Sequence, residues 1–366
     1  MQQNKLNQEE TGNGSILRSF EEEDLKQLLG NKGFPAYRSK QILSWLWEKG
    51  ESDVDKWTDL PKDLRAWIKD SFIIDSLRLT NSLQSQDGTI KFTFALADEP
   101  NIEIESVLIP SRDGKRSTLC VSSQAGCAIG CTFCATGTLG LLRNLKWYHI
   151  LEQFVQVQKA TGKRITNVVF MGMGEPMQNL KNVITAIQKM HNYFDLGYRH
   201  ITVSTVGIPK GIIKLADELP KVRLALSLHS AIQSKREQII PLAQAISLDQ
   251  IVDALKYYQG RHGRWITYEY VLLPGFNDTK EDVSALVEMG TEVPAKVNII
   301  PFNPFPKAPF RAPTQKEIYR FATMLKKKYP YPVTVRMSRG KDISGACGQL
   351  ALLHKKSLDS HNNDKA

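Results

Sequence analysis

Apolar positions recur at two different spacings along the 366-residue chain. Between residues 17 and 73 they follow the helical period, in "FEEEDLKQLL", "YRSKQILSWLWEKG" and "LPKDLRAWIKDSF". From 77 to 123 they nearly alternate, and Asp-Gly pairs at 87–88 and 113–114 divide the alternating segments as in β-hairpins. The pattern predicts a helical module over residues 17–75, followed by a β-hairpin extension over 76–116.

Beyond residue 134, strand-like and helix-like segments alternate along the chain. Strands are expected at 167–172, 200–205, 222–229, 265–273 and 296–302, and helices at 147–160, 179–193, 209–218, 248–258, 280–289 and 314–328. With a first strand in "TLCVSS", this makes six β-α units, which predict an α/β fold with a parallel sheet and a site at the carboxyl ends of its strands. Six units rather than eight indicate an open, partial (βα)6 barrel over residues 117–340. The polar ends, 1–16 and 354–366, are expected to be disordered tails.

Composition limits the class of protein. With 42% hydrophobic and 23% charged residues the chain is typical of a soluble globular protein. No apolar run approaches the ~20 residues that cross a bilayer, and the first residues do not resemble a signal peptide, so we expect a cytoplasmic protein without a membrane partner. A formal charge of +10 favours a polyanionic partner, although a basic protein without one is equally compatible with charge alone.

Four of the five cysteines lie in "CVSSQAGCAIGCTFC", residues 120–134. In a cytoplasmic protein such clusters bind metal or carry out redox chemistry more often than they form disulfides. Cys127, Cys131 and Cys134 are spaced C-x3-C-x2-C, one thiolate short of a tetrahedral zinc site or a fully capped [4Fe–4S] cluster. A Cys3His zinc site with His149 is one alternative. The absence of a second cysteine pair favours an iron–sulfur cluster with one iron open to a small chelating ligand.

Several motifs carry a resemblance to known enzymes. "CTFC" and "GMGEP", within the β-α alternation, resemble the radical S-adenosylmethionine (SAM) superfamily. "TLCVSSQAGC", "MGMGEPMQN", "SLHS", "IPFNPFP" and "VRMSRGKDISGACGQL" occur in this order within residues 17–353 and resemble the RlmN/Cfr family of RNA adenine methyltransferases. "GEP" and "SRGKDI" look more like RlmN than Cfr. The resemblance implies a barrel of the radical SAM type, in which Cys127, Cys131 and Cys134 hold one [4Fe–4S] cluster and SAM occupies the open iron.

The resemblance also implies a reaction: methylation of carbon 2 of adenine 2503 in 23S rRNA and of adenine 37 in some tRNAs. This carbon lies between two ring nitrogens and is electron-poor, so it needs a radical route. In the family, a methyl group from one SAM moves to a cysteine, and a radical from a second SAM removes hydrogen from that methyl. The methylene radical then adds to the base, and a second cysteine resolves the covalent link by forming a disulfide. Two alternatives stay open: methylation of carbon 8, as in Cfr, and a non-catalytic basic RNA-binding protein with a structural metal site.

The family's residue roles transfer onto matching positions. Cys347, in a C-terminal loop over residues 341–353, is implied to be the methyl carrier, Cys120 the resolving thiol and Glu105 the proton acceptor. SAM contacts are implied at Gly174, Glu175, Ser204, Ser227, Leu228, His229 and Asn303. Without the resemblance, Cys347 between glycines still indicates an accessible thiol, whereas Cys120 is as typical of a buried strand and Glu105 of a solvated hairpin face. Gly172 and Gly174 are expected to let the backbone approach a ligand.

The implied partners are 23S rRNA, some tRNAs and a reducing electron donor such as flavodoxin, with the enzyme acting as a monomer. The helical module is expected to take part in RNA recognition. Candidate RNA-contacting residues, all cations or aromatics in polar segments, are Arg38, Lys40, Lys235, Arg236, Arg261, Arg264, Trp265 and Lys326, Lys327 and Lys328. The target adenine must leave its stack to reach a buried radical.

Overall fold

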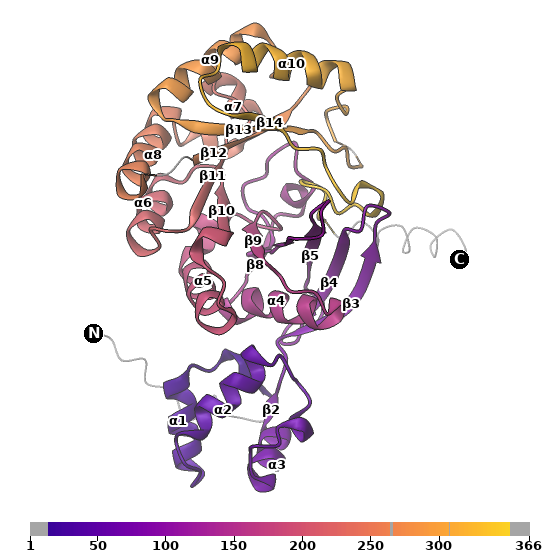
Figure 1. The fold of residues 1–366 in the computed structure, drawn as a ribbon, viewed down its shortest axis with the longest axis vertical. Helices are drawn as coiled ribbons and strands as arrows, with labels where there is room; N and C mark the ends of the chain where they lie inside the picture. Colours follow the sequence, from indigo (N-terminus) through magenta and orange to yellow (C-terminus); the bar gives the residue numbers. More distant parts are fainter. Residues whose placement is uncertain (1–13, 264–265, 307, 352–366) are drawn as a thin grey trace.

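The computed structural model describes residues 14–263, 266–306 and 308–351. A small helical module and a larger body built on one curved sheet are visible as separate masses in Figure 1. Residues 1–13 and 352–366, which hold nearly all of the two expected tails, lie outside the described residues, as do Arg264 and Trp265.

The helical module is closed by a short parallel strand pair, β1 (Ser15–Ile16) with β2 (Phe72–Ile73). Between these strands lie α1 (Glu22–Asn31), α2 (Arg38–Leu43), a π-helical turn (Ser44–Glu48) and α3 (Lys62–Ser71). Its apolar stripes surround Trp47 and Trp57, which are almost fully buried. Ser15 and Ile16 are thus part of the module, whereas the hydrophobic pattern placed them in the tail.

A buried ion network joins this module to the larger body. Arg18, fully buried, lies 3.0 Å from Asp75 Oδ1 and 3.5 Å from Glu152 Oε1 of α4. The ring of Trp47 also packs against Trp147, with centroids 5.8 Å apart. Contacts between buried rings and a buried ion network fix the module against the sheet rather than leaving it on a free linker.

The larger body contains a single ten-stranded sheet, in the order β14-β13-β12-β11-β10-β9-β6-β5-β4-β3. One edge is antiparallel and contains β3 (Leu77–Gln84), β4 (Ile90–Leu96), β5 (Glu103–Pro110) and β6 (Ser117–Cys120). From β6 onward the strands run parallel: β9 (Asn167–Phe170), β10 (Ile201–Thr205), β11 (Arg223–Ser227), β12 (Ile266–Leu272), β13 (Ala295–Pro301) and β14 (Val333–Val335). The predicted hairpin extension therefore continues the barrel sheet.

Helices connect the parallel strands and cover the outer face of the sheet (Figure 1). They are α4 (Trp147–Thr161), α5 (Leu180–Phe194), α6 (Pro209–Glu218), α7 (Gln233–Ile239), α8 (Leu248–His262), α9 (Lys280–Glu292) and α10 (Gln315–Lys328). The predicted partial barrel is confirmed. The sequence pattern missed β14 and a small hairpin, β7 (Gln124–Gly126) with β8 (Leu141–Asn144), because strands of three or four residues are too short to show a period. Within the described ranges, every helix is too short or too polar to cross a bilayer.

The chain does not end at the last strand of the barrel. After β14, residues 336–351 run back to the antiparallel edge, where this yellow segment lies beside the tips of β3 and β4 in Figure 1. Hydrogen bonds from Ser85 Oγ to Asp342 Oδ1 (2.6 Å) and from Gly340 N to Asp87 Oδ2 (2.9 Å) join the two regions. Cys347 is thereby brought next to strands more than 220 residues earlier in the sequence.

Candidate active site

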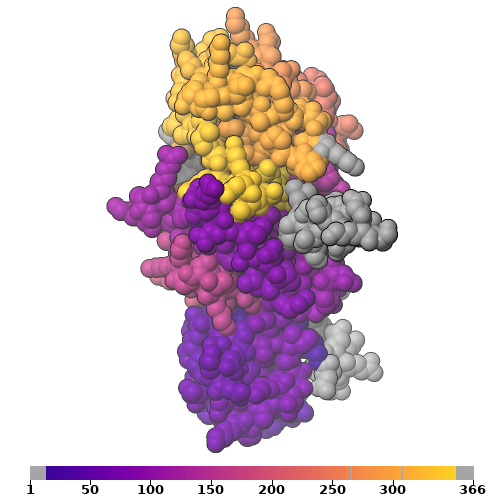
Figure 2. All heavy atoms as spheres, turned by 90° about the vertical axis from the view of Figure 1, so that its right-hand side faces the viewer, coloured from indigo at the N-terminus to yellow at the C-terminus, as the bar shows by residue number. Residues whose placement is uncertain are grey.

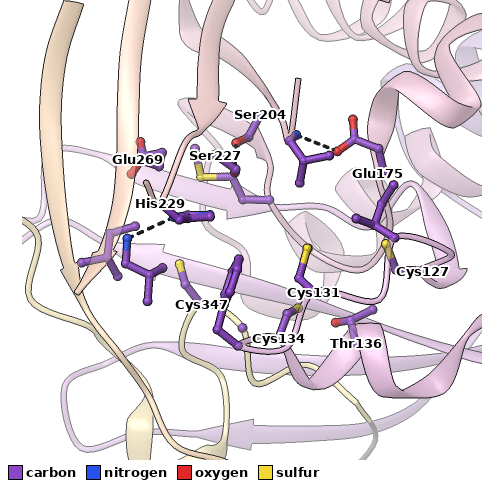
Figure 3. Close-up of a pocket in the computed structure, with 18 of the residues that line it drawn as sticks. Cys127, Cys131, Cys134, Thr136, Glu175, Ser204, Ser227, His229, Glu269 and Cys347 are labelled. Atoms are coloured by element: carbon purple, nitrogen blue, oxygen red, sulfur yellow. Dashed lines mark hydrogen bonds between the residues drawn. The ribbon is translucent and has the colours of Figure 1, made fainter. Parts of the chain in front are cut away.

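An open cavity lies at the carboxyl ends of the parallel strands. Cys127, Cys131 and Cys134 all line it, on the loop that follows β7. Figure 3 shows these thiols on one side of the cavity, and His229 and Glu269 on the other. The three cysteines thus line one cavity, and their joint binding of a cluster stays a prediction.

Most residues with an implied SAM contact line the same cavity. They are Gly174, Glu175, Ser204, Ser227, His229 and Asn303. Leu228 does not line it: its side chain is in the main hydrophobic core and its carbonyl accepts a hydrogen bond from Arg236 Nε. His149, the fourth ligand of the alternative zinc site, is on α4, where its Nε2 lies 3.7 Å from Asp98 Oδ1. Among the described residues, no three His, Cys, Asp or Glu side chains are close enough to hold a single metal ion.

Glu175 fixes the loop after β9. One carboxyl oxygen accepts a hydrogen bond from Met177 N (3.0 Å) and the other from Val206 N (2.9 Å), so the carboxyl links the ends of β9 and β10. Burial raises the pKa of Glu175, and the hydrogen bond from Val206 N opposes that rise. Glu175 is also among the residues that line the cavity.

His229 presents a defined tautomer to the cavity. Its Nδ1 accepts a hydrogen bond from Val271 N (3.0 Å), and its ring packs edge-on against Phe133, with centroids 4.5 Å apart. Burial, reinforced by Arg236, lowers the pKa of His229 to about 3, so the ring is neutral at physiological pH. Because Nδ1 accepts, the proton is on Nε2, which is a hydrogen-bond donor at the cavity.

Two buried oxygen atoms of the cavity wall lack a hydrogen-bond partner among the described residues. Asn303 donates from Nδ2 to the carbonyl of Cys347 (3.2 Å), but its Oδ1 is unpaired. Glu269 accepts from Asn298 Nδ2 at Oε1 (3.0 Å), but its Oε2 is unpaired. Such atoms are costly unless a ligand or water satisfies them, so both indicate a binding site for a molecule with donor groups.

The glycines of "GMGEP" line the cavity and also pack closely against the chain itself. A Cβ on Gly172 would lie 2.6 Å from the carbonyl oxygen of Val121, and one on Gly174 would lie 2.5 Å from Gln124 Cβ. Gly174 also has φ of 98°, which side-chain-bearing residues rarely adopt. Packing against residues 121–124 therefore requires glycine at both positions, and the approach to a ligand stays a prediction.

A second cavity adjoins the first. Its lining includes Cys120 at the end of β6, Arg336 after β14, and Val107 and Ile109 of β5. Cys347 and Cys134 line both cavities, and Cys347 lies between His229 and Cys134 in the view of Figure 3. The implied methyl carrier and resolving thiol, 227 residues apart, thus share one cavity.

Burial and a nearby cation act in opposite directions on the pKa of the Cys120 thiol. Burial, together with the neighbouring Cys347, raises the pKa of Cys120 to about 12, and the Arg336 guanidinium opposes this rise. The Cys347 sulfur in turn raises the pKa of Arg336, which is half-buried. All five cysteines are free in this structure. Arg336 is therefore the cation that faces the thiol pair, a role that the sequence analysis did not assign.

Glu105 lies in β5 and is fully buried, rather than on a solvated hairpin face. It is on the same face of the strand as Val107 and Ile109, which line the second cavity, because alternate residues share a face. Its Oε1 lies 3.0 Å from Lys91 Nζ, and the lysine side chain is only 2% exposed. Glu105 itself is not among the residues that line either cavity.

The RNA-contact candidates differ in availability. Arg236 is buried, with hydrogen bonds to the carbonyls of Leu228 and Val206, so the prediction that it contacts RNA is wrong. Lys235 is paired with Asp282 at 2.8 Å. The exposed candidates are Lys40, Arg261, Lys326, Lys327 and Lys328, while Arg38 is half-buried. A run of basic residues shows charge but not burial, which is why the pattern did not separate these cases.

Comparison with known proteins agrees with this architecture. Residues 121–289 match the family model described as the radical SAM superfamily, and residues 16–74 match the ribosomal RNA large subunit methyltransferase N-terminal domain. A protein of Christiangramia forsetii named "Probable dual-specificity RNA methyltransferase RlmN" is 40% identical over 92% of this chain and 96% of its own. The "Dual-specificity RNA methyltransferase RlmN" of Anaeromyxobacter sp. is 41% identical, covering 92% and 90%. A crystal structure of a radical SAM methyltransferase from Sphaerobacter thermophilus is 39% identical, covers 92% of this chain and 99% of that one, and superposes with a TM-score of 0.86.

Proposed function

This chain belongs to the RlmN family of radical SAM enzymes, and we propose that it methylates carbon 2 of adenine in RNA. The proposed targets are adenine 2503 of 23S rRNA and adenine 37 of some tRNAs, with two SAM consumed per methylation. The observation that carries the proposal is the position of Cys347, which lines the cavity of the three clustered cysteines and also the cavity of Cys120. A two-thiol methyl transfer requires such a shared position.

Membership of the radical SAM superfamily implies a [4Fe–4S] cluster and SAM, and the cavity fits both. Three thiols lie on one wall, and the unpaired oxygens of Asn303 and Glu269 supply acceptors for a ligand that has amino and hydroxyl groups. We propose that Cys127, Cys131 and Cys134 hold the cluster. The proposed SAM contacts are Gly174, Glu175, Ser204, Ser227, Leu228, His229 and Asn303. When bound, the cluster and SAM supply the methyl group and the radical that removes one of its hydrogen atoms.

The residues of this cavity orient the ligand and exclude water. Glu175 holds the β9 and β10 loop ends together through its two backbone hydrogen bonds. Neutral His229 offers Nε2–H as a donor without adding a positive charge beside the cluster. Asn303 holds the carbonyl of Cys347, so the methyl carrier is fixed to the same wall. Positioning of this kind is a major part of the catalytic contribution of a protein.

In this mechanism Cys347 gives up its thiol proton and becomes a thioether when it accepts the methyl group. After the former methyl carbon is joined to the base, Cys120 attacks the sulfur of Cys347. The sulfur–sulfur bond forms as the carbon–sulfur bond breaks, and the electron pair stays with the carbon, which takes up a proton to complete the new methyl group. Since the pKa of Cys120 is raised to about 12, Arg336 is proposed to favour the thiolate needed for this attack.

Addition of the methylene radical leaves an unpaired electron on the base, so restoring the aromatic ring requires loss of one electron, which the oxidised cluster would accept, and of the hydrogen on carbon 2 as a proton. We propose the Glu105 carboxylate as the proton acceptor. Two features support this role. Glu105 is completely buried beside Lys91, and it lies on the same face of β5 as Val107 and Ile109, which line the second cavity. A reducing electron donor such as flavodoxin is proposed to supply the electron that starts the radical chemistry. The remaining partners are proposed from the same family membership: rRNA and tRNA bound by a monomer.

Anaerobic reconstitution with iron and sulfide tests the proposal. We expect a brown protein that, with reductant and SAM, methylates a 23S rRNA fragment, and mass spectrometry of the digested nucleosides should show 2-methyladenosine. Finding only 8-methyladenosine would favour the Cfr-like alternative. A colourless zinc protein that binds RNA without cleaving SAM would favour the non-catalytic alternative.

A further inference from the structure

The segment that carries Cys347 is held by the β3–β4 hairpin through side chains without a role in the scheme above. Asp342 accepts hydrogen bonds from Ser85 Oγ (2.6 Å) and Gln86 N (3.2 Å), and Asp87 accepts one from Gly340 N (2.9 Å). Figure 2 shows the yellow segment lying directly against the purple strands. The hairpin turn thus holds the start of the loop in place.

Close packing supports the same contact. Gly340 has φ of 67°, and a Cβ there would lie 2.9 Å from Cγ2 of Thr89. Thr89 is the residue immediately before β4. Larger residues at this position would push the loop away from the hairpin. The loop is therefore placed by the antiparallel edge of the sheet, and not only by β14, from which it emerges.

Lys91 of β4 lies at the centre of this arrangement. Its side chain is 2% exposed, and Nζ lies 3.0 Å from Glu105 Oε1 and 3.5 Å from the carbonyl oxygen of Ser344. Ser344 is three residues before Cys347, so one ammonium group touches both the strand of the proposed base and the loop of the proposed methyl carrier. Burying a lysine is costly, and a salt bridge offsets that cost only in good geometry. A pair so deeply buried adds little to the net stability of the fold, but it fixes the positions of the Lys91 and Glu105 side chains.

We propose that Lys91 is a positioning residue that ties the Glu105 carboxylate to the Cys347 loop, so that proton acceptor and methyl carrier reach the target adenine in one arrangement. The assignment rests on the proposed function. In the step concerned, the hydrogen of carbon 2 passes as a proton to a Glu105 oxygen. Lys91 takes no part in that transfer, and its salt bridge holds the carboxylate in place.

The test uses Lys91→Met in the reconstituted holoenzyme, with two reactions measured separately. Methylation of Cys347 by SAM without RNA should stay within about twofold of the wild-type rate, because Glu105 takes no part in it. Methylation of the 23S rRNA fragment should fall about tenfold or more, because a displaced general base loses part of its usual contribution of about 10²–10⁴-fold, and the covalent enzyme–RNA adduct should persist.

Two further variants separate charge from structure. Lys91→Arg keeps a cation beside Glu105 and should recover most of the lost RNA methylation. Lys115→Met, in the exposed turn between β5 and β6, is the matched control and should stay within about twofold of wild type in both reactions. Equal loss in Lys91→Met and Lys91→Arg, in both reactions, would assign Lys91 a purely structural role and overturn the proposal, as would wild-type RNA methylation by Lys91→Met.

A double variant controls for misfolding caused by a buried Glu105 carboxylate that has lost its cation. Lys91→Met combined with Glu105→Gln lacks that charge, and it should methylate RNA at the same rate as Glu105→Gln alone, because Lys91 acts through Glu105. A further large drop in the double variant would contradict this. If the wild-type holoenzyme methylates neither Cys347 nor RNA, the proposed function itself fails, an outcome distinct from an active wild type with a normal Lys91→Met variant.

Discussion

The two cavities that meet at Cys347 are built in different ways. The first is walled by the ends of parallel strands, and its polar groups are held by hydrogen bonds from the backbone, such as those to Glu175 and His229. The second is closed by the segment after β14, which side chains of the β3–β4 hairpin hold in place. In the first cavity the sheet itself fixes the geometry, whereas in the second a terminal segment supplies a wall.

This contrast matches the molecules that each cavity is proposed to admit. A small cofactor can enter a preformed site, and strand ends give it precise contacts. The proposed site of the RNA base is instead closed by a segment that returns from the end of the chain, and Lys91 Nζ lies 3.5 Å from the carbonyl oxygen of Ser344 in that segment. Substitutions should therefore separate into those that affect the SAM side and those that affect the RNA side.

The largest effect is expected from Cys347→Ala, at the junction of the cavities. It removes the methyl acceptor, so RNA methylation should be abolished and no methylated protein thiol should form. Iron content and reductive cleavage of SAM should remain, because Cys127, Cys131 and Cys134 are untouched. Mass spectrometry of the protein after incubation with SAM checks the first point, and 5′-deoxyadenosine release checks the second. A methyl group still bound to the variant would contradict the assignment of the carrier.

Cys120→Ala should stop turnover at a later stage. The first cavity is intact, so Cys347 is methylated and the covalent link to RNA forms, but no thiol is available to resolve it. We expect a shifted protein band on denaturing gels with labelled RNA. The double variant Cys120→Ala with Cys347→Ala is the control and should form no adduct. Multiple turnovers by the single variant would show that another group resolves the link.

Arg336→Met should slow resolution without affecting the SAM side. The pKa of Cys120 is already raised to about 12 by burial, and removing the guanidinium raises it further, so less thiolate is present at any pH below that value. Each unit of pKa corresponds to about a tenfold loss of thiolate. Decay of the adduct should accelerate as pH rises from about 7 to 9 and be about tenfold slower in this variant, with Arg336→Lys intermediate. A decay rate independent of pH would contradict the role of the thiolate.

Much of this fold was predictable because its helices and strands follow local periodicities of apolar residues. The change from helical spacing to alternation, and then to β-α alternation, locates the module, the antiparallel edge and the barrel. The spacing of Cys127, Cys131 and Cys134 places them on one short loop, so their convergence needs no tertiary information. Strand β14 has three residues and contains no such signal.

The groups that the sequence did not identify depend on neighbours far along the chain. Lys91 lies in a strand of alternating residues that resembles the polar face of a hairpin, yet it is buried beside Glu105 and contacts the returning C-terminal segment at Ser344. Arg336 follows a short strand, and its role is visible only beside Cys120 and Cys347. Arg236 looks like part of a surface charge run but is buried against two carbonyls. Charge and spacing alone do not distinguish a solvated cation from a buried one.

The smallest effect should come from the first cavity, where many contacts share the binding energy. Ser204 Oγ lies 3.2 Å from Ser227 Oγ, and both line the cavity. Ser204→Ala removes the proposed contact of this hydroxyl with SAM, a neutral hydrogen bond worth about 0.5–1.5 kcal/mol, so the Kd for SAM should rise roughly 2- to 10-fold. Ser284→Ala on the exposed face of α9 is the control. Equilibrium binding to the holoenzyme measures the first effect, and the adduct lifetime should stay at the wild-type value. An unchanged Kd with an altered adduct lifetime would place Ser204 on the RNA side and break the proposed division between the cavities.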